Sequence, residues 1–317
     1  MGNNLISMDN SIKDLQYNKV LEILEEYDIR NSYERIQKIP EESELRNALS
    51  SHLNEVNFGK KSILGIDIRM YGSFDDFVQP LIPILYRVLF EETIDHCLRT
   101  QEFIFQTYDK ETITKQTIDT GDGGYVVFDT PLHSLLFASS FAFILRLYNS
   151  YHFLPKLRTI IGEINLRYAI TYDRVYKIND NYYGRSIINN SRIISKDSLN
   201  RCLIDEGSYQ WFLLNIDGLE NLQVLSINEI SNIDAFQNYD QSIIVSGKND
   251  YFEEKENTRN FGIINSDLLK VGMIKSKNTE LNVYNVHIQV SIVMHANDAD
   301  KKRTITISLG NLNTQGI

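Results

Sequence analysis

The chain has 317 residues, 42% of them hydrophobic and 23% charged, so it can bury a large core without disulfides. Its formal net charge of −10 argues against a protein that holds nucleic acid on a broad basic surface, although one pocket with metal ions could still hold a nucleotide. Cys97 and Cys202 form no zinc or redox motif and indicate a reducing compartment. The polar amino-terminal stretch and the short or interrupted apolar runs predict a cytoplasmic protein without a signal peptide and without a membrane partner.

Residues 1–58 are expected to form an amino-terminal helical region. The stretch "KDLQYNKVLEILEEYDI" places Leu15, Val20, Leu21 and Leu24 at helical spacing with charged residues between them. A second helical segment is expected to follow Pro40. These helices precede the first strong strand of the chain.

Residues 59–216 alternate between strand and helix patterns. The expected strands are 61–70, 102–110, 123–130, 164–180, 181–184 and 201–206, and the expected helices are 73–100, 131–152 and 185–201. Ser73 or Asp75 is the expected cap of the first of these helices. Because hairpins and helices are mixed in this order, we predict an α+β fold with an antiparallel-rich sheet covered by helices.

Residues 217–317 are predicted to form a β-rich accessory extension. The expected strands are 222–230, 241–247, 280–295 and 303–310. The last two alternate well between apolar and polar residues, and the charged stretch "ANDADKK" joins them into an expected long hairpin.

Two aspartates in this pattern suggest a metal site. Asp67 closes the apolar strand in "SILGIDIRMYGSF", and Asp122 lies between Gly121 and Gly123 in "TGDGGYVVF". Mg²⁺ prefers carboxylate and phosphate oxygens and usually takes one or two carboxylates from the protein. Backbone N–H groups around Gly72 could contact phosphate, and the bare Gly121 would let a nucleotide approach. Alone, each aspartate has a more ordinary interpretation as a strand-end cap or a hairpin turn residue.

The motifs around these aspartates resemble the catalytic core of class III nucleotide cyclases. The similar segments are "LGIDIRMYGSF", "TGDGGYVVF" and "LRYAITYDRVYKINDNYYGRSIINNSRI", which occur in the family's order. In the last segment Gly184 opens a helix, and Arg192 follows it by eight residues. The resemblance covers about residues 60–215, and it implies the cyclase fold for a catalytic domain over residues 59–216.

The resemblance also implies roles for individual residues. Asp67 and Asp122 would bind two Mg²⁺ or Mn²⁺ ions, with help from the Ile68 carbonyl. Arg192 would stabilise the charge that develops on the transferring phosphate. The implied reaction is attack of the ribose 3′-hydroxyl on the α-phosphate, which gives a 3′,5′-cyclic nucleotide and pyrophosphate. Since the family shares its active sites between two domains, one core per chain implies a symmetric homodimer.

The chain departs from the purine cyclases at the base-reading positions. Ile118 lies four residues before Asp122, where those enzymes carry a base-reading Lys or Glu. Ile188 lies four residues before Arg192, where they carry an Asn, although the adjacent Asn189 could serve instead. The metal-binding and transition-state groups are therefore present, whereas the purine-reading groups are not.

This combination resembles the pyrimidine nucleotide cyclases of the bacterial Pycsar antiphage systems, whose cyclic products activate a separate effector. Tyr71 matches a bulky aromatic residue that narrows the base pocket of that subgroup, and it could equally be an ordinary core tyrosine. Asp119, Thr120 and Arg99 could decide between uracil and cytosine. The resulting prediction is a uridylate cyclase that uses UTP.

Three alternatives stay open at this stage. A cytidylate cyclase would use CTP and make cyclic CMP. A non-catalytic cyclase-like protein would bind a nucleotide or a partner without turnover, as the changes at Ile118 and Ile188 would allow. A purine cyclase is disfavoured by Ile118.

Overall fold

The computed structural model describes residues 16–28, 41–50, 52–53, 59–252, 261–276, 279–295 and 302–317. Residue contacts divide the chain into two compact units. One comprises Met1–Lys60 and Arg174–Arg185, and the other comprises Lys61–Asp173 and Ser186–Ile317. The domain boundaries expected after residues 58 and 216 stay a prediction.

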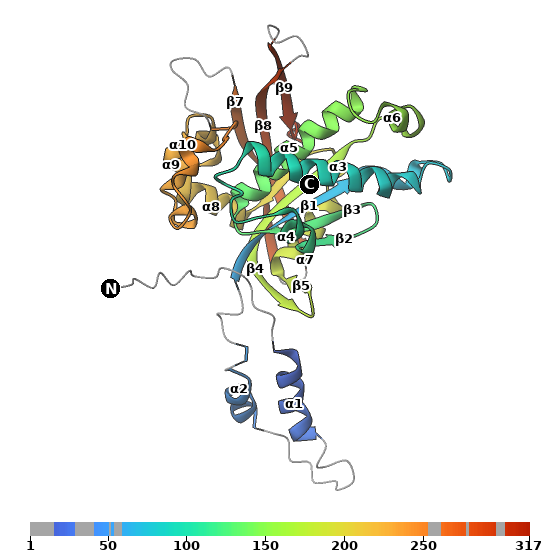
Figure 1. Ribbon diagram of the computed structural model, residues 1–317. Helices are drawn as coiled ribbons and strands as arrows, with labels where there is room; N and C mark the ends of the chain where they lie inside the picture. Colours follow the sequence, from blue (N-terminus) through green and yellow to red (C-terminus); the bar gives the residue numbers. More distant parts are fainter. Residues whose placement is uncertain are drawn as a thin grey trace. The chain divides into compact units, whose positions relative to one another are not determined.

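The described chain contains helices and strands in alternation (Figure 1). The α-helices are α1 (Tyr17–Asp28), α2 (Glu42–Ser50), α3 (Leu81–Thr100), α4 (Lys110–Lys115), α5 (Pro131–Asn149), α6 (Pro155–Ile161), α7 (Arg185–Lys196), α8 (Glu206–Ile216), α9 (Ile227–Ser231) and α10 (Ile243–Ser246). The 3₁₀ helices are η3 (Tyr71–Ser73), η4 (Leu219–Gln223) and η5 (Asp234–Phe236). The strands are β1 (Gly59–Ile68), β2 (Thr117–Asp119), β3 (Gly123–Phe128), β4 (Leu166–Ile178), β5 (Asn181–Gly184), β6 (Cys202–Asp205), β7 (Gly262–Ser276), β8 (Thr279–His295) and β9 (Lys302–Leu309).

These strands form one sheet in the order β2-β3-β1-β4-β6-β8-β7, with β5 paired to β4 and β9 paired to β8. The pairing of β4 with β6 is parallel, and the pairings of β3 with β1, of β6 with β8 and of β8 with β9 are antiparallel. The predicted α+β class with an antiparallel-rich sheet is therefore confirmed. The long hairpin expected near residues 280–310 is present as β8 and β9.

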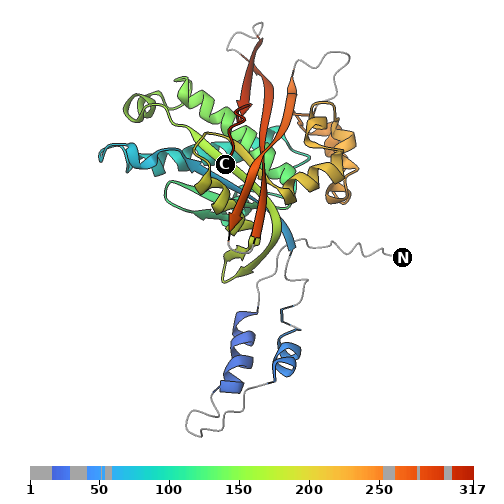
Figure 2. The same cartoon turned by 180° about the vertical axis from the view of Figure 1, so that it is seen from behind.

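Helices α3 and α5 cover one face of the sheet, as Figure 1 shows, and the opposite view in Figure 2 brings β7, β8 and β9 to the front. The core-facing side chains of β1 and β4, such as Ile66 and Ile170, join the main apolar cluster with these helices. Their neighbours point the other way, because successive strand residues face opposite sides. Ala169 accordingly belongs to a second, smaller cluster with Ile193 of α7, so α7 packs on the other face of the sheet.

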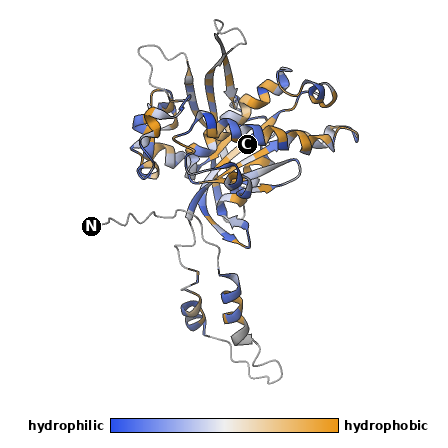
Figure 3. Ribbon diagram, in the orientation of Figure 1, coloured by the Kyte–Doolittle hydropathy of each residue, from blue (hydrophilic) through white to orange (hydrophobic). Residues whose placement is uncertain are grey.

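Helix α5 is the most apolar helix of the core, and Figure 3 shows it largely in the hydrophobic colour. Of the described helices, it alone is long and apolar enough to cross a membrane. Within its most apolar 18-residue stretch, 78% is buried inside the protein. Thr130 caps its start by accepting a hydrogen bond from the His133 N–H, and Pro131 takes the first helical position, where no backbone donor is needed.

The segment expected as a strand over 102–110 is instead a series of turns that leads into α4. Phe103 and Phe105 are fully buried, as their apolar pattern indicated. The predicted strand conformation of this segment was wrong. Asp109 then starts α4 by accepting from the Thr112 N–H at 2.7 Å.

The segments expected as strands over 222–230 and 241–247 are helical. Ser226 and Glu229 form a capping box that starts α9, a signal that the sequence "SINE" already contained. Strand β7, which was not expected, pairs with β8 along most of its length. The β-rich character of the last hundred residues therefore comes from β7, β8 and β9, and these three continue the same sheet as β1 to β6.

Candidate active site

The antiparallel pairing of β1 and β3 brings Asp67 and Asp122 together. Asp67 lies opposite Gly123, and the Ile68 N–H donates to the Asp122 carbonyl at 3.0 Å. Asp67 lies on the α7 face of the sheet because its neighbours Ile66 and Ile68 face the main core. We call Asp67 and Asp122, at these adjoining strand ends, the aspartate edge.

Glycines make the close approach at this edge sterically accessible. A Cβ on Gly123 would lie 2.1 Å from the Ile66 carbonyl oxygen, so the two strands can approach only with glycine there. Gly121 has a φ of 91° and open space where a side chain would be. The Asp119 carboxylate accepts from the Gly121 N–H at 2.7 Å, so Asp119 shapes the turn that presents Asp122.

Arg167 is the principal partner of Asp67, although the sequence motifs did not predict it as a site residue. Its Nε and Nη2 atoms donate to Asp67 Oδ2 at 2.8 and 2.5 Å, and its Nη1 donates to the Asp197 carbonyl at 2.6 Å. Arg167 is flanked by Leu166 and Tyr168, which face the main core. A lone basic residue within an apolar strand pattern was the signal that could have placed it on the opposite face, beside Asp67.

The charges at the edge shift the acidity of Asp67. Burial raises the pKa of Asp67 above its usual value, the hydrogen bonds and charge of Arg167 lower it, and the nearby charge of Asp122 raises it. The net result is a raised pKa. Repulsion between two neighbouring carboxylates is the situation that a bound cation relieves.

The donor set of the edge fits a metal ion that is held jointly by protein and substrate. Both contacts of Arg167 fall on Oδ2 of Asp67, which leaves Oδ1 for a metal. In the part of the chain that the structure describes, no three or more His, Cys, Asp or Glu side chains gather into a metal cluster. Two carboxylates with phosphate oxygens match the usual Mg²⁺ arrangement, and a cage made by protein alone is not present among these residues. The contribution of the Ile68 carbonyl stays a prediction.

The side chain of Tyr86, on α3, packs against the hairpin of β2 and β3 near Gly124. A Cβ on Gly124 would lie 3.5 Å from the Tyr86 hydroxyl oxygen. Burial, together with the charges of Asp119 and Asp67, raises the pKa of Tyr86 far above its usual value, so the phenol stays neutral. Among the described residues, no hydrogen-bond partner of this buried hydroxyl is present. Tyr86 lies within an apolar helical pattern, so no local signal distinguished it from an ordinary core residue.

The loop after β1 differs from the expected helix start. Helix α3 begins at Leu81, and Asp75 instead caps the preceding turn by accepting from the Phe77 and Val78 N–H groups at 3.0 and 2.9 Å. Pro83 consequently falls in the first helical turn, where a missing N–H is tolerated. The expected helix over 73–100 therefore starts about two turns later than its pattern suggested.

Residues 70–73 form the segment whose backbone N–H groups were expected to face phosphate. The Ser73 N–H donates to the Met70 carbonyl at 2.9 Å, so it is already used, while Gly72 is exposed with open space around it. The Tyr71 hydroxyl donates to the Gln79 carbonyl at 3.4 Å, and its ring packs against the main core. The roles of Tyr71 and Gly72 in substrate binding stay predictions.

Helix α7 carries Arg192 and Asn189, which the sequence motifs had assigned to the same site as the two aspartates. Arg192 donates from Nη1 to Thr279 Oγ1 at 3.4 Å, and of the described residues neither aspartate of the edge contacts it. Asn190 is fully buried and its amide donates to the Ile63 and Ala169 carbonyls, both at 2.8 Å, so it joins β1 to β4. Asn189 is half-buried on the same helix. The role expected for Arg192, in a site shared with a second copy of the chain, stays a prediction.

The comparisons with known proteins concern the fold alone. Neither a protein-family model nor a curated protein sequence matches the chain. Among solved structures, the chain is similar to an adenylate/guanylate cyclase/hydrolase from Silicibacter pomeroyi, with 12% identity, a TM-score of 0.41, and coverage of 72% of this chain and 96% of that one.

Two further solved structures give similar values. The adenylyl cyclase CyaB from P. aeruginosa has 12% identity and a TM-score of 0.39, covering 72% of this chain and 94% of that one. A monomeric adenylate cyclase from Trypanosoma brucei has 11% identity and a TM-score of 0.39, covering 79% of this chain and 94% of that one. Scores this low carry no argument about the chemistry of this chain, which must come from the site itself.

Proposed function

We propose that this chain is a pyrimidine nucleotide cyclase that converts UTP to 3′,5′-cyclic UMP and pyrophosphate with Mg²⁺ or Mn²⁺. The observation that carries the proposal is the juxtaposition of Asp67 and Asp122 at the ends of β1 and β3. Two carboxylates on adjoining strand ends can hold a pair of metal ions that are shared with a triphosphate. The motif resemblance that includes both aspartates and Arg192 supports the same reaction.

The residues of the chain have separate tasks in this reaction. Bound metal ions would neutralise phosphate charge and favour the deprotonated 3′-hydroxyl. Asp67 and Asp122 would hold those ions, and Arg167 keeps the Asp67 carboxylate oriented through its two contacts on Oδ2. Gly72 and Gly121 would leave room for the phosphates and the sugar. Arg192 of a second copy would stabilise the charge of the transition state.

The preference for a pyrimidine rests on Ile118. This residue lies on β2 opposite Tyr125, and its side chain offers no hydrogen bond to a base. Tyr71 would narrow the base pocket, and Asn189 would contact the sugar or base. We propose uracil rather than cytosine as the base, in agreement with the prediction from the sequence. A role as a signal in antiphage defence, acting through a separate effector, follows from the resemblance and is part of the same proposal.

The direct test is product formation by the purified chain with Mn²⁺ and each of UTP, CTP, ATP and GTP. We expect cyclic UMP and an equal amount of pyrophosphate from UTP. Cyclic CMP from CTP would correct the base and retain the reaction. Equal turnover of ATP would contradict the pyrimidine assignment. Binding of UTP without any product would favour the non-catalytic sensor.

The shared active site has its own test. Asp67→Ala and Arg192→Ala should each be inactive alone, because each removes one half of every site. In a mixture that exchanges subunits, half of the dimers are mixed and each has one intact site, so about a quarter of the wild-type rate should return. No recovery in a mixture that demonstrably exchanges subunits would show that both residues act within one chain.

A further inference from the structure

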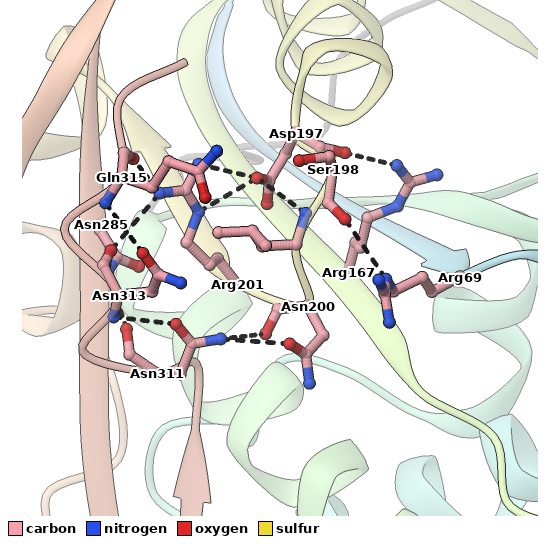
Figure 4. Close-up of polar contacts among 11 residues, drawn as sticks. Arg69, Arg167, Asp197, Ser198, Asn200, Arg201, Asn285, Asn311, Asn313 and Gln315 are labelled. Atoms are coloured by element: carbon pink, nitrogen blue, oxygen red, sulfur yellow. Dashed lines mark hydrogen bonds and ion pairs between the residues drawn. The ribbon is translucent and has the colours of Figure 1, made fainter.

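A buried ion pair lies next to the aspartate edge, in the loop between α7 and β6. We call residues 197–201 the bridge loop. Arg201 donates from Nε and Nη2 to Asp197 Oδ1 at 3.0 and 2.8 Å. The two residues are only 1% and 3% exposed, so the pair is almost completely withdrawn from water. Figure 4 shows it between Arg167 on one side and the end of the chain on the other.

The segment 310–317, which we call the strap, binds the bridge loop from the outside. Arg201 donates from Nη1 to the Gln315 carbonyl at 2.5 Å and to the Asn313 carbonyl at 3.4 Å. The Asn311 amide donates to the Asn200 carbonyl at 2.9 Å, and the Asn285 amide of β8 donates to the Asn311 carbonyl at 2.7 Å. These contacts tie the strap to both the loop and the sheet.

The strap also closes the second apolar cluster. Ile317 packs against this cluster, which contains Ala169 and Leu203 of the sheet together with Ile193 of α7. A Cβ on Gly272 would lie 3.8 Å from the Ile317 Cβ, which places this end of the strap beside β7. The strap is therefore held by apolar packing at Ile317, by the Arg201 guanidinium in its middle, and by the amide contacts of Asn311 near its start.

On its inner side the bridge loop holds the cation that orients Asp67. The Asp197 carbonyl accepts from Arg167 Nη1 at 2.6 Å, while the Asp197 carboxylate binds Arg201. The Ser198 carbonyl accepts from Arg69 Nε at 3.3 Å. One residue, Asp197, thus connects the strap to the guanidinium beside Asp67, as the dashed lines in Figure 4 allow the reader to follow.

We propose that Arg201 is a positioning residue of the metal site, and that the strap fixes Asp67 through Arg201, Asp197 and Arg167. Loosening the strap would free the bridge loop, and Arg167 would then hold Asp67 less rigidly. Groups that orient a metal ligand typically change metal affinity by about 10- to 100-fold when they are removed. The metal part of this inference rests on the proposed function, whereas the coupling between strap and Asp67 does not.

Two variants test the coupling, and a third is the control. Arg201→Met removes the guanidinium directly. The double variant Asn285→Ala with Asn311→Ala loosens the strap while leaving the buried ion pair intact. It provides the test if Arg201→Met does not fold. Lys61→Met is the matched control, because it breaks another partly buried ion pair, with Asp129, at the far end of β1.

The first readout is Mn²⁺ binding, measured by the loss of the free Mn²⁺ signal in electron paramagnetic resonance. We expect about 10-fold weaker binding in the two test variants and unchanged binding in Lys61→Met. In turnover assays the KM for Mn²⁺ should rise while kcat at saturating Mn²⁺ stays near the wild-type value. A folded test variant with wild-type Mn²⁺ affinity overturns the proposal.

The second readout requires no metal. Hydrogen–deuterium exchange should become faster at the Ile68 and Arg69 amides in the test variants and remain unchanged in Lys61→Met. Unchanged exchange at these amides in the test variants overturns the coupling. A wild-type chain that binds Mn²⁺ and yields no cyclic product would overturn the proposed function alone, since Mn²⁺ affinity and exchange still decide this inference.

Discussion

The aspartate edge and the bridge loop both hold acidic groups beside an arginine, but they are built from different parts of the sequence. At the edge, Asp67 and Asp122 are half-buried and come from a strand end and a hairpin turn that local patterns reveal. In the bridge loop, Asp197 is buried, its partners come from β4 and from the loop itself, and its partner Arg201 also donates to the strap. The accessible region can perform chemistry, and the buried region can hold that chemistry in place.

The largest difference between the two regions is expected when the aspartate edge loses one carboxylate, because activity should then fall while stability changes little. Asp122→Ala should lower cyclic nucleotide formation by at least about 100-fold, because metal-ion stabilisation is worth several kcal/mol and about 1.4 kcal/mol is a factor of ten. The melting temperature should change little, since Asp122 is half-buried. Asp234→Ala, which removes an aspartate distant in sequence, is the control and should retain full activity. A fully active Asp122→Ala enzyme would remove the edge from the mechanism.

The bridge loop should respond in the opposite way. Asp197→Ala leaves the Arg201 charge buried without its carboxylate, and breaking such a pair typically lowers the free energy of unfolding by about 3 to 5 kcal/mol. Urea unfolding followed by circular dichroism measures this change. Arg87→Ala removes an exposed ion pair with Glu91 on α3, and it should have no measurable effect. Equal stability losses in the two variants would contradict the distinction between buried and exposed pairs.

The backbone of the edge can be tested apart from its charges. Gly123→Ala places a methyl group 2.1 Å from the Ile66 carbonyl, so the strands must separate. We expect a loss of about 1 to 3 kcal/mol in unfolding free energy, together with reduced activity. Gly72→Ala is the matched control, because nothing lies within 4 Å of its added Cβ. Thermal unfolding of both variants gives the difference, and two equal melting temperatures would show that β1 and β3 accommodate the methyl group.

The last comparison concerns Asp205, a second buried carboxylate that caps α8. Burial raises its pKa to about 7, against the hydrogen bonds from Ser208 and Tyr172 that lower it. Since the folded pKa lies above the unfolded value of 3.8, stability is fully present below pH 4 and is lost as pH rises toward 7. Each unit of pKa difference corresponds to about 1.4 kcal/mol.

Asp205→Asn keeps the capping oxygen and removes the ionisation. Its stability should therefore vary less between pH 4 and pH 7 than that of the wild type, so its advantage should be largest at pH 7. Urea unfolding at several pH values measures this difference. A parallel pH profile for the two proteins would show that Asp205 is already ionised at low pH in the folded state.

Much of the sheet and half of the site could be predicted from the sequence. Strand β1, the β2–β3 turn and the β4–β5 pair carry period-two patterns or turn residues that act locally. Segment 102–110 failed because a buried turn and a buried strand contain the same apolar residues. The pattern of β4 could have placed Arg167 on the face of Asp67, but the contact between the two residues, like that of Arg201 with Gln315, joins positions far apart in the sequence that only the folded sheet brings together.

The composition of α5 has a consequence for biosynthesis. Its apolar surface is covered in part by β9, which leaves the ribosome roughly 150 residues later, or about 10 to 30 s at ordinary translation rates. During that interval the nascent chain exposes a segment that passes the length and hydropathy test for a membrane span. We therefore expect chains that stop before β9 to leave this surface of α5 uncovered and to collect in the insoluble fraction.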